Sequence, residues 1–362
     1  MNPHDPLPMR SHSLFALAFA ATLLDCSTPD TSGVPKAQET PETTPLAVAK
    51  VTEVNPRLLR RFQSIETPAP PSSPTAAAKL ALGRQLFFDP RLSMDQDLSC
   101  NGCHALDRYG MDGSATSKGR SGAHGTRNAP TVFNAAGHFA QFWDGRAQTV
   151  EEQAKGPISN PIEMGLPADQ AVARLKAVDE YVNEFAKAYP GDADPVTIDH
   201  VGDAIGAFER TLVLRSRWDV YLEGDRTALS AAEKEGLRVF LNSGCMVCHT
   251  GKYVGGSMFE RLGAVEPWPN SSDVGRMAVT GSPADRMMFK VPSLRNVEKT
   301  APYFHDGSAK TLDQAVQMMG RHQLGIDLAP EEIQSIVTWL RSLTADLPHD
   351  LTARPRLPGE KA

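Results

Sequence analysis

The chain has 362 residues, which allows for about two domains, and its 41% hydrophobic and 22% charged residues are typical of a globular protein with a substantial core. The net charge is −6, and lysine and arginine form no dense block, which argues against nucleic acid as a partner. The longest apolar run, residues 14–24, is too short to cross a membrane as a helix, which excludes a polytopic membrane protein.

The N-terminus has the order of an export signal. Arg10 precedes the apolar run, and Cys26 follows it directly after Asp25. This order predicts a signal peptide over residues 1–25 and a periplasmic location. It also resembles a bacterial lipoprotein signal, in which Cys26 is lipidated, becomes the first mature residue and tethers the protein to the membrane. Asp25 departs from that signal, so an ordinary cleaved signal with an unmodified Cys26 is the alternative.

The segment after Cys26 differs from the rest of the chain in composition. Nine prolines stand among threonine, serine and glutamate in residues 27–74. Such a segment buries too little apolar surface to fold. The sequence therefore predicts a disordered tether over residues 26–74.

The other four cysteines form two copies of one motif. These are Cys100-Asn-Gly-Cys103-His104 and Cys245-Met-Val-Cys248-His249. Cys-x-x-Cys-His is the attachment motif of haem c, in which two thiols add to the vinyl groups at one porphyrin edge and the adjacent histidine binds the iron. The motifs therefore predict two covalently bound haem c groups, with His104 and His249 as iron ligands.

Paired cysteines have two other uses. Two Cys-x-x-Cys pairs can bind zinc, but 141 residues separate Cys103 from Cys245 here, far more than in zinc ribbons. A redox-active pair needs no histidine after it, whereas both copies have one. Haem c is therefore the favoured interpretation.

Helical patterns precede both motifs. A helix is predicted over residues 76–87, and Ser230-x-x-Glu233 is a capping box for a second helix that runs toward Phe240. Near the end of the chain, apolar residues recur at helical spacing; they are Ile333, Ile336, Val337 and Leu340.

These patterns predict a mainly α fold with two cytochrome c-like domains, each with one haem c. The first domain is expected over residues 75–213 and the second over residues 214–345. The tail, residues 346–362, is expected to pack on the first domain. Long glycine-rich loops are predicted over residues 105–127 and 250–290.

The two predicted domains carry an internal repeat. Pro130-Thr-Val matches Pro292-Ser-Leu, and thirteen residues later Trp143-Asp-Gly matches His305-Asp-Gly.

The repeat breaks fourteen residues after the tryptophan or histidine, where the second copy has Met319 and the first has Pro157. A thioether is a good sixth ligand for haem iron, whereas proline cannot bind iron. The second haem is therefore predicted to be closed by His249 and Met319, with Met318 as the alternative ligand. The first haem can be open to a substrate.

Residues 80–343 resemble the bacterial dihaem cytochrome c peroxidases. The segments that carry the resemblance are Leu86-Phe-Phe-Asp-Pro-Arg-Leu-Ser, Arg127-Asn-Ala-Pro-Thr-Val-Phe-Asn, Gln141-Phe-Trp-Asp-Gly-Arg, Gln153-Ala-Lys-Gly-Pro, Glu163-Met, Phe289-Lys-Val-Pro-Ser-Leu-Arg-Asn and Ala301-Pro-Tyr-Phe-His-Asp-Gly. The resemblance implies that the first haem, on His104, reduces peroxide. It implies that the second haem, on His249 and Met319, receives electrons.

The resemblance also implies roles for residues around the haems. Gln153 and Glu163 match the pair in the family's distal pocket, with Glu163 as the proton shuttle. Trp143 matches the tryptophan that lies between the haems. A calcium ion is implied between the domains, since oxygen ligands suit this hard cation. Its implied ligands are Asn128 and the backbone carbonyl groups of Thr300 and Pro302.

The chain departs from the family at the loop that caps the first iron. In the oxidised family enzyme a loop histidine binds this iron and leaves before peroxide enters. Here Arg120 stands at that position, and arginine is not a normal iron ligand. Either His124 caps the iron from a shifted loop or no residue does, with His138 as a weaker candidate. A solvent-exposed His124 without a special role is the alternative.

The expected function is reduction of hydrogen peroxide to water, with electrons from a small periplasmic donor such as cytochrome c or a cupredoxin. Two other functions stay open. A MauG-type dihaem enzyme oxidises tryptophan residues of a protein partner, but it carries a tyrosine where this chain has Met319. A plain dihaem electron carrier needs both irons capped and leaves Gln153 and Glu163 without a purpose. The resemblance further implies a homodimer.

Overall fold

The computed structural model describes residues 54–361. The predicted signal peptide, Cys26 and the predicted tether up to residue 53 lie outside the described residues. The contacts divide the chain after Ala49, and every described residue belongs to the second unit. Its regular structure is almost entirely helical, which confirms the prediction of a mainly α fold. Within residues 54–361, no helix combines the length and the apolar character that a membrane span requires.

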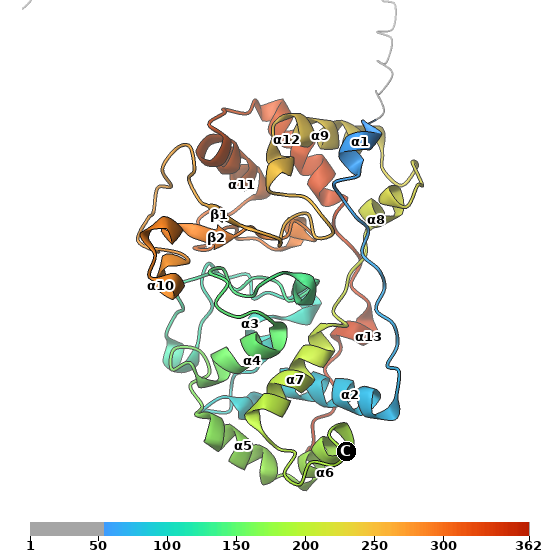
Figure 1. Ribbon diagram of the computed structural model, residues 1–362, viewed down its shortest axis with the longest axis vertical. Helices are drawn as coiled ribbons and strands as arrows, with labels where there is room; N and C mark the ends of the chain where they lie inside the picture. The colour runs from blue at the N-terminus through green and yellow to red at the C-terminus, as the bar shows by residue number, and fades with distance from the viewer. Residues whose placement is uncertain (1–53, 362) are drawn as a thin grey trace, which may run out of the picture. The chain divides into compact units, whose positions relative to one another are not determined.

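A first hydrophobic core, drawn mainly from residues 82–214, forms what we call the N-terminal lobe. Its helices are α2 (Pro74–Phe88), α3 (Cys100–Cys103), α4 (Val150–Ser159), α5 (Ala168–Lys176), α6 (Asp179–Ala188) and α7 (Ile198–Glu209) (Figure 1). Helix α2 packs against α7, and Gly83 permits this contact. A Cβ atom at Gly83 would lie only 1.8 Å from the carbonyl oxygen of Ala204, so a larger residue would force the two helices apart.

A second hydrophobic core, drawn mainly from residues 218–343, forms the C-terminal lobe. Its elements are α8 (Arg217–Leu222), α9 (Ala231–Asn242), β1 (Phe259–Arg261), α10 (Met277–Thr280), β2 (Met288–Lys290), α11 (Leu312–Met318) and α12 (Pro330–Arg341). Helices α9 and α12 pack together at Gly236, where a Cβ atom would lie 1.9 Å from the carbonyl oxygen of Ser335. The two lobes thus use the same device, a glycine inside one helix, to bring a helix pair together.

The predicted helices are confirmed. Helix α2 contains residues 76–87, and the side chains of Ser230 and Glu233 form the capping box that begins α9. The apolar stripe near the end of the chain lies on the buried face of α12. The stretch 250–290 is not entirely loop, however. It contains the antiparallel pair β1 and β2, in which Phe259 lies opposite Lys290.

The predicted tether is wrong for its last part, because residues 54–65 pack on the C-terminal lobe. Helix α1 (Pro56–Leu59) and Phe62 bury apolar side chains in the second core, and the rings of Phe62 and Trp218 meet edge to face at 5.4 Å. The amide of Ile65 donates to the Asp219 carboxylate at 2.8 Å. These contacts supply the burial that composition alone did not reveal. Beyond residue 65 the chain runs to α2 of the N-terminal lobe (Figure 1).

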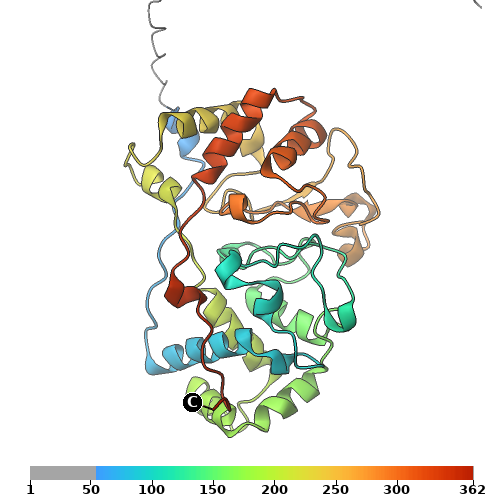
Figure 2. The same cartoon turned by 180° about the vertical axis from the view of Figure 1, so that it is seen from behind.

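The C-terminal tail makes the opposite crossing. After α12 it runs back along the N-terminal lobe through α13 (His349–Thr352) (Figure 2). The hydroxyl of Tyr109 donates to the Ala345 carbonyl at 2.9 Å, and Leu357 is buried in the first core. Each lobe is therefore completed by a segment from the far end of the described chain.

Candidate functional site

A cavity of about 790 Å³ reaches both Cys-x-x-Cys-His segments. Its walls come from both lobes, and apolar side chains such as Leu98, Val132 and Leu340 make up much of its lining. The cysteines and histidines of the two motifs all line it; they are Cys100, Cys103, His104, Cys245, Cys248 and His249. The structure therefore brings the two predicted haem attachment sites to one continuous space.

The first motif forms the short helix α3, and its histidine is oriented by a backbone contact. The Nδ1 atom of His104 lies 3.3 Å from the carbonyl oxygen of Gly110. Because a carbonyl can only accept, Nδ1 carries the proton and Nε2 is left as a ligand atom. Burial lowers the pKa of His104, which keeps the imidazole neutral, the form that binds a metal.

The second motif repeats this arrangement. The Nδ1 atom of His249 lies 3.3 Å from the carbonyl oxygen of Val254, and burial lowers the pKa of His249 to about 4. Both imidazoles are therefore neutral, and one backbone carbonyl group orients each of them. Such a contact fixes the ring plane before a metal is bound.

The thiols weigh against zinc and against a redox-active pair. All four cysteines in the described chain are free. Burial raises the pKa of Cys100 to about 12 and that of Cys245 to about 11, whereas a reactive cysteine needs a stabilised thiolate. Across residues 54–361, no group of three or more His, Cys, Asp or Glu side chains is placed to hold a metal ion. A large apolar cavity with two neutral histidines beside paired thiols fits two haem c groups.

Met319 lies where α11 ends and a π-helical turn, residues 319–324, begins. It lines the cavity together with His249, while Met318 packs against the second core. The matching position in the N-terminal lobe is Pro157, which sits inside α4 and also lines the cavity. The structure thus places the two residues at which the repeat breaks in equivalent positions, one with a possible ligand atom and one without.

The repeat is visible in the backbone as well. The amide of Gln141 donates to Ala147 at 2.8 Å, and the amide of Tyr303 donates to Ala309 at the same distance. Between these pairs lie Trp143 in one copy and His305 in the other.

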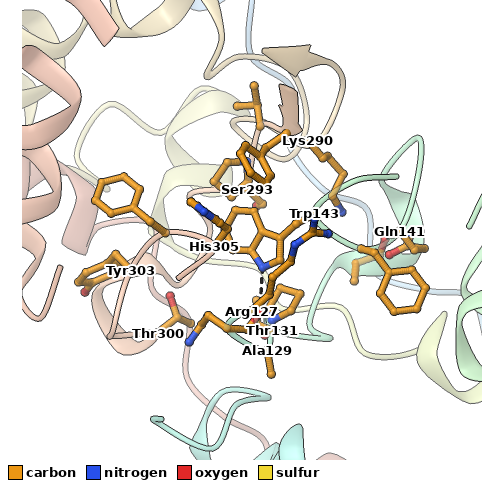
Figure 3. A pocket seen from close by; sticks show the side chains of 18 of the residues that line it. Arg127, Ala129, Thr131, Gln141, Trp143, Lys290, Ser293, Thr300, Tyr303 and His305 are labelled. Atoms are coloured by element: carbon orange, nitrogen blue, oxygen red, sulfur yellow. Dashed lines mark hydrogen bonds between the residues drawn. The ribbon is translucent and has the colours of Figure 1, made fainter. Parts of the chain in front are cut away.

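These two matched residues face one another across the lobes, with ring centroids 6.4 Å apart (Figure 3). The indole Nε1 of Trp143 donates to the Asn128 carbonyl at 2.9 Å, and the Asn128 amide donates to the His305 carbonyl at 2.6 Å. His305 is only 1% exposed, and neither of its ring nitrogens has a hydrogen-bond partner in the described chain. Trp143 is therefore held rigidly at the junction of the lobes.

Gln153 and Glu163 both line the cavity, from α4 and from the turn that follows it. Burial raises the pKa of Glu163, and the nearby charge of Arg146 opposes that shift. The Glu163 carboxyl thus keeps its proton to a higher pH than an exposed glutamate does. This property suits a group that exchanges protons with a substrate.

The loop that carries Arg120 and His124 lines the cavity at Gly119 and Gly125, but the side chains of both residues are engaged outside it. The guanidinium of Arg120 pairs with Asp95 at 3.2 Å, and its amide donates to the Glu163 carbonyl at 2.8 Å. His124 is exposed, and its Nδ1 lies 3.1 Å from the Thr116 carbonyl oxygen. Neither side chain is among the cavity's lining residues. His138 does line the cavity, but its Nδ1 is engaged by Lys290.

The three residues implied as calcium ligands, Asn128, Thr300 and Pro302, all line the cavity at the junction of the lobes. The side-chain amide of Asn128 donates to the Ser114 carbonyl at 2.8 Å. A calcium ion at this position stays a prediction.

Three charged residues at the cavity escaped prediction. Arg127 joins the lobes, because it donates to Asp273 at 2.6 and 2.8 Å and to Asp144 at 2.6 Å. Glu209 is buried beside Cys100, and burial together with the nearby charge of Glu151 raises its pKa to about 8. Lys290 is only 7% exposed. Charged residues inside otherwise apolar segments were the signal available for Glu209 and Lys290.

Comparisons with known proteins find similar di-haem peroxidases. The family model for di-haem cytochrome c peroxidase matches residues 77–227. Cytochrome c551 peroxidase of Nitrosomonas europaea is 47% identical over 76% of this chain and 83% of that protein, and the protein of the same name from Pseudomonas aeruginosa is 46% identical over 76% and 81%.

More distant relatives include MauG proteins. Methylamine utilization protein MauG of Methylorubrum extorquens is 35% identical over 83% of this chain and 88% of that protein. Among solved structures, a MauG-like protein associated with microbial copper homeostasis matches with a TM-score of 0.67 and 31% identity, over 81% of this chain and 95% of that one.

Proposed function

Because this chain belongs to the di-haem cytochrome c peroxidase family, we propose that its cavity holds two haem c groups with different roles. Peroxide is reduced at the first haem, on His104, and electrons enter at the second, on His249. The relatives at 45–47% identity are cytochrome c peroxidases, so the chain is an oxidoreductase that acts on hydrogen peroxide. The proposal therefore concerns the roles of individual residues, the electron donor and the protein partners.

The contrast between Met319 and Pro157 carries the proposal. A Met319 thioether would close an iron held by His249 and raise its potential, which favours electron transfer. Pro157, at the matching position, would offer an iron held by His104 no ligand atom. One haem is then a closed electron store and the other is open to peroxide.

When bound, each haem supplies a redox-active iron, and the first iron offers peroxide a position in the cavity. Gln153 orients the peroxide through its amide group. Glu163 accepts a proton from the nearer oxygen and returns it to the departing one, which leaves as water. Two electrons and two protons in total convert hydrogen peroxide into two water molecules. Trp143, hydrogen bonded at the lobe junction, lies on the route by which the electrons cross between the lobes.

Several finer assignments belong to the same proposal. The protein works in the periplasm after export, and lipidation of Cys26 tethers it there. Its electron donor is a small protein such as a cytochrome c or a cupredoxin. Two copies form a homodimer. Calcium is bound at the lobe junction by Asn128 and the carbonyl groups of Thr300 and Pro302.

Two other functions fit the chain less well. A MauG-type enzyme that oxidises tryptophan residues of a partner carries tyrosine at the position of Met319. The 35% identity to MauG of Methylorubrum extorquens is also lower than the 47% to the cytochrome c551 peroxidase of Nitrosomonas europaea. A plain electron carrier needs a cap on the first iron, and His124 is exposed and bonded to Thr116 instead.

The test combines spectra with turnover. Optical and EPR spectra of the oxidised protein are expected to show one high-spin haem and one low-spin haem with methionine ligation. Steady-state assays are expected to show oxidation of a reduced cytochrome c or cupredoxin that depends on peroxide. Two low-spin haems and no such turnover would leave the electron carrier as the better function. Oxidation of a partner's tryptophan without turnover of the donor would favour the MauG type.

A further inference from the structure

Lys290 is a buried cation that has no acidic partner among residues 54–361. It ends strand β2, its side chain is 7% exposed, and its backbone amide donates to the Trp143 carbonyl at 2.7 Å. In the described part of the chain, its ammonium group makes one polar contact, with Nδ1 of His138 at 3.3 Å. Burial is the only cause that shifts the pKa of Lys290, which it lowers to about 8. A buried ammonium group needs a counter-charge to be stable.

His138 adds a second unsatisfied group beside it. Its ring packs edge to face on Tyr253 at 5.2 Å, and its buried Nε2 has no hydrogen-bond partner in the described part of the chain. Gly256 leaves room for the ring, since a Cβ atom there would lie 2.6 Å from Cδ2 of His138. His138 belongs to the N-terminal lobe and Lys290 to the C-terminal lobe, so the pair bridges the junction.

The protein's own acidic groups at the cavity are committed elsewhere. Asp144 is paired with Arg127 at 2.6 Å and with Arg146 at 3.1 Å. The carboxyl of Glu163 interacts with Asn160 and Arg146, and Glu209 lies beside Cys100. The fourth acidic residue at the cavity, Glu260, accepts a hydrogen bond from the Arg261 amide. None of these carboxyl groups pairs with Lys290, so an anion bound in the cavity can supply the counter-charge.

A haem carries that charge. Its two thioether bonds fix one porphyrin edge at the paired cysteines, and its two propionate carboxylates project from the opposite edge, away from the cysteines. Lys290 and His138 line the same cavity as both cysteine pairs. Lys290 lies at the lobe junction beside Trp143 (Figure 3). Carboxylate is the anion that an ammonium and an imidazole N–H bind most readily by charge-assisted hydrogen bonds.

We propose that Lys290 and His138 form a carboxylate site that binds a propionate of one haem and thereby ties that haem to the opposite lobe. This inference rests on the proposed presence of two haem c groups. When the site is filled, the Lys290 ammonium neutralises the propionate, and Nε2 of His138 supplies a second hydrogen bond. The pair then sets the reduction potential of that haem, because an uncompensated carboxylate favours ferric iron.

The experiment compares Lys290→Met with wild type and with two controls, all as haem-loaded full chains. Lys290→Arg retains the cation, and Lys310→Met removes an exposed lysine of the same lobe. Spectroelectrochemical titration measures the two haem potentials separately, and resonance Raman spectra report hydrogen bonding through the propionate bending bands. Pyridine haemochrome assays confirm that each variant carries two haems.

Lys290→Met is expected to lower the potential of one haem, changing its ferrous-to-ferric ratio at a fixed potential by about tenfold, the scale of one buried charge pair. The propionate bands should shift in the same variant. Lys290→Arg and Lys310→Met should leave both readouts near wild type. His138→Phe should move the Raman bands with a smaller change in potential, and it provides a second test if Lys290→Met fails to fold.

Unchanged potentials and unchanged propionate bands in Lys290→Met, with two haems bound and peroxidase turnover intact, would overturn the carboxylate site and leave the peroxidase standing. Equal shifts in Lys290→Met and Lys310→Met would also overturn it, since they would reflect net charge alone. A wild-type protein without two covalent haems would instead overturn the proposed function on which the site rests.

Discussion

Arg120 and Asp95 form an ion pair, with Nε and Oδ2 3.2 Å apart, that joins the loop after the first motif to the segment before it. The same loop is held by the bond from the Arg120 amide to the Glu163 carbonyl. Gly119 lies so close to this turn that a Cβ atom there would be 1.8 Å from the Ile162 carbonyl oxygen. At the position that holds a capping histidine in the peroxidases that this chain resembles, the arginine side chain is paired with Asp95 and does not line the cavity.

The oxidised protein is therefore expected to react with peroxide without prior reduction, which stopped-flow mixing of the oxidised form with peroxide measures. Arg120→His is expected to restore the cap, so that this variant reacts only after one electron has been added. His124→Ala serves as the control and should behave as wild type does. Inert oxidised wild type that is activated by His124→Ala would show instead that His124 is a working cap.

Met319→His is expected to lower the potential of the second haem and to slow turnover with the donor, because imidazole stabilises ferric iron more than a thioether does. Potentiometric titration followed at the second haem measures this change. Met318→Leu is the matched control and should leave the potential unchanged. An unchanged potential in Met319→His together with a changed potential in Met318→Leu would assign the ligand to Met318.

Glu163→Gln is expected to reduce the peroxidase rate by about 10²–10⁴-fold while both haems stay attached, the usual contribution of general acid–base catalysis. Stopped-flow kinetics of the reaction with peroxide gives the rate. Glu152→Gln, on the exposed side of α4, is the control and should keep the wild-type rate. A Glu163→Gln rate within a factor of two of wild type would remove Glu163 from the mechanism.

Loss of the buried Arg295–Asp219 pair is expected to destabilise the C-terminal lobe. Arg295 is 2% and Asp219 0% exposed, and the pair also receives the Ile65 amide. Asp219→Ala leaves a buried guanidinium uncompensated, which costs about 3–5 kcal/mol of unfolding free energy. Urea unfolding measures the change, and proteolysis around residues 54–65 should accelerate. Glu184→Ala breaks an exposed pair with Lys187 and should cost less than about 1 kcal/mol.

Glu209 is expected to make the protein less stable as pH rises. Its pKa is raised from 4.5 to about 8, so the folded state keeps a proton that the unfolded state has lost between these values. Its favourable contribution is complete below about pH 4.5 and is lost as pH rises through 8. Glu209→Gln should therefore gain stability relative to wild type from pH 5 to pH 8, in urea unfolding of the haem-loaded proteins. A difference independent of pH would contradict the buried, protonated carboxyl.

Local signals predicted the helices and the motifs well. The capping box of α9 and the apolar stripe of α12 are determined by residues within a few positions of one another. The two Cys-x-x-Cys-His segments are equally local. The repeat aligned Trp143 with His305, and the same alignment placed Pro157 opposite Met319.

Long-range partners could not be predicted in this way. Ile65 finds its partner Asp219 at a separation of 154 residues, so proline content alone suggested disorder where the chain is packed. The same limit applied to the bond from Lys290 to His138, 152 residues away, and to the ion pair of Arg120 with Asp95. A charged side chain in an apolar strand indicates an unusual environment, but its partner is known only once the lobes are brought together.

The exchange of end segments between the lobes limits how this protein can be divided. A fragment of residues 75–213 lacks Ala345 and Leu357, which belong to its core, and a fragment of residues 214–345 lacks Leu59 and Phe62. Neither haem-binding half is therefore a self-sufficient cytochrome module. The two lobes therefore have to fold together as one unit. The core of the N-terminal lobe is complete only when the C-terminal tail packs on it, and residues 54–65 pack on a lobe whose residues lie more than 150 positions later in the chain.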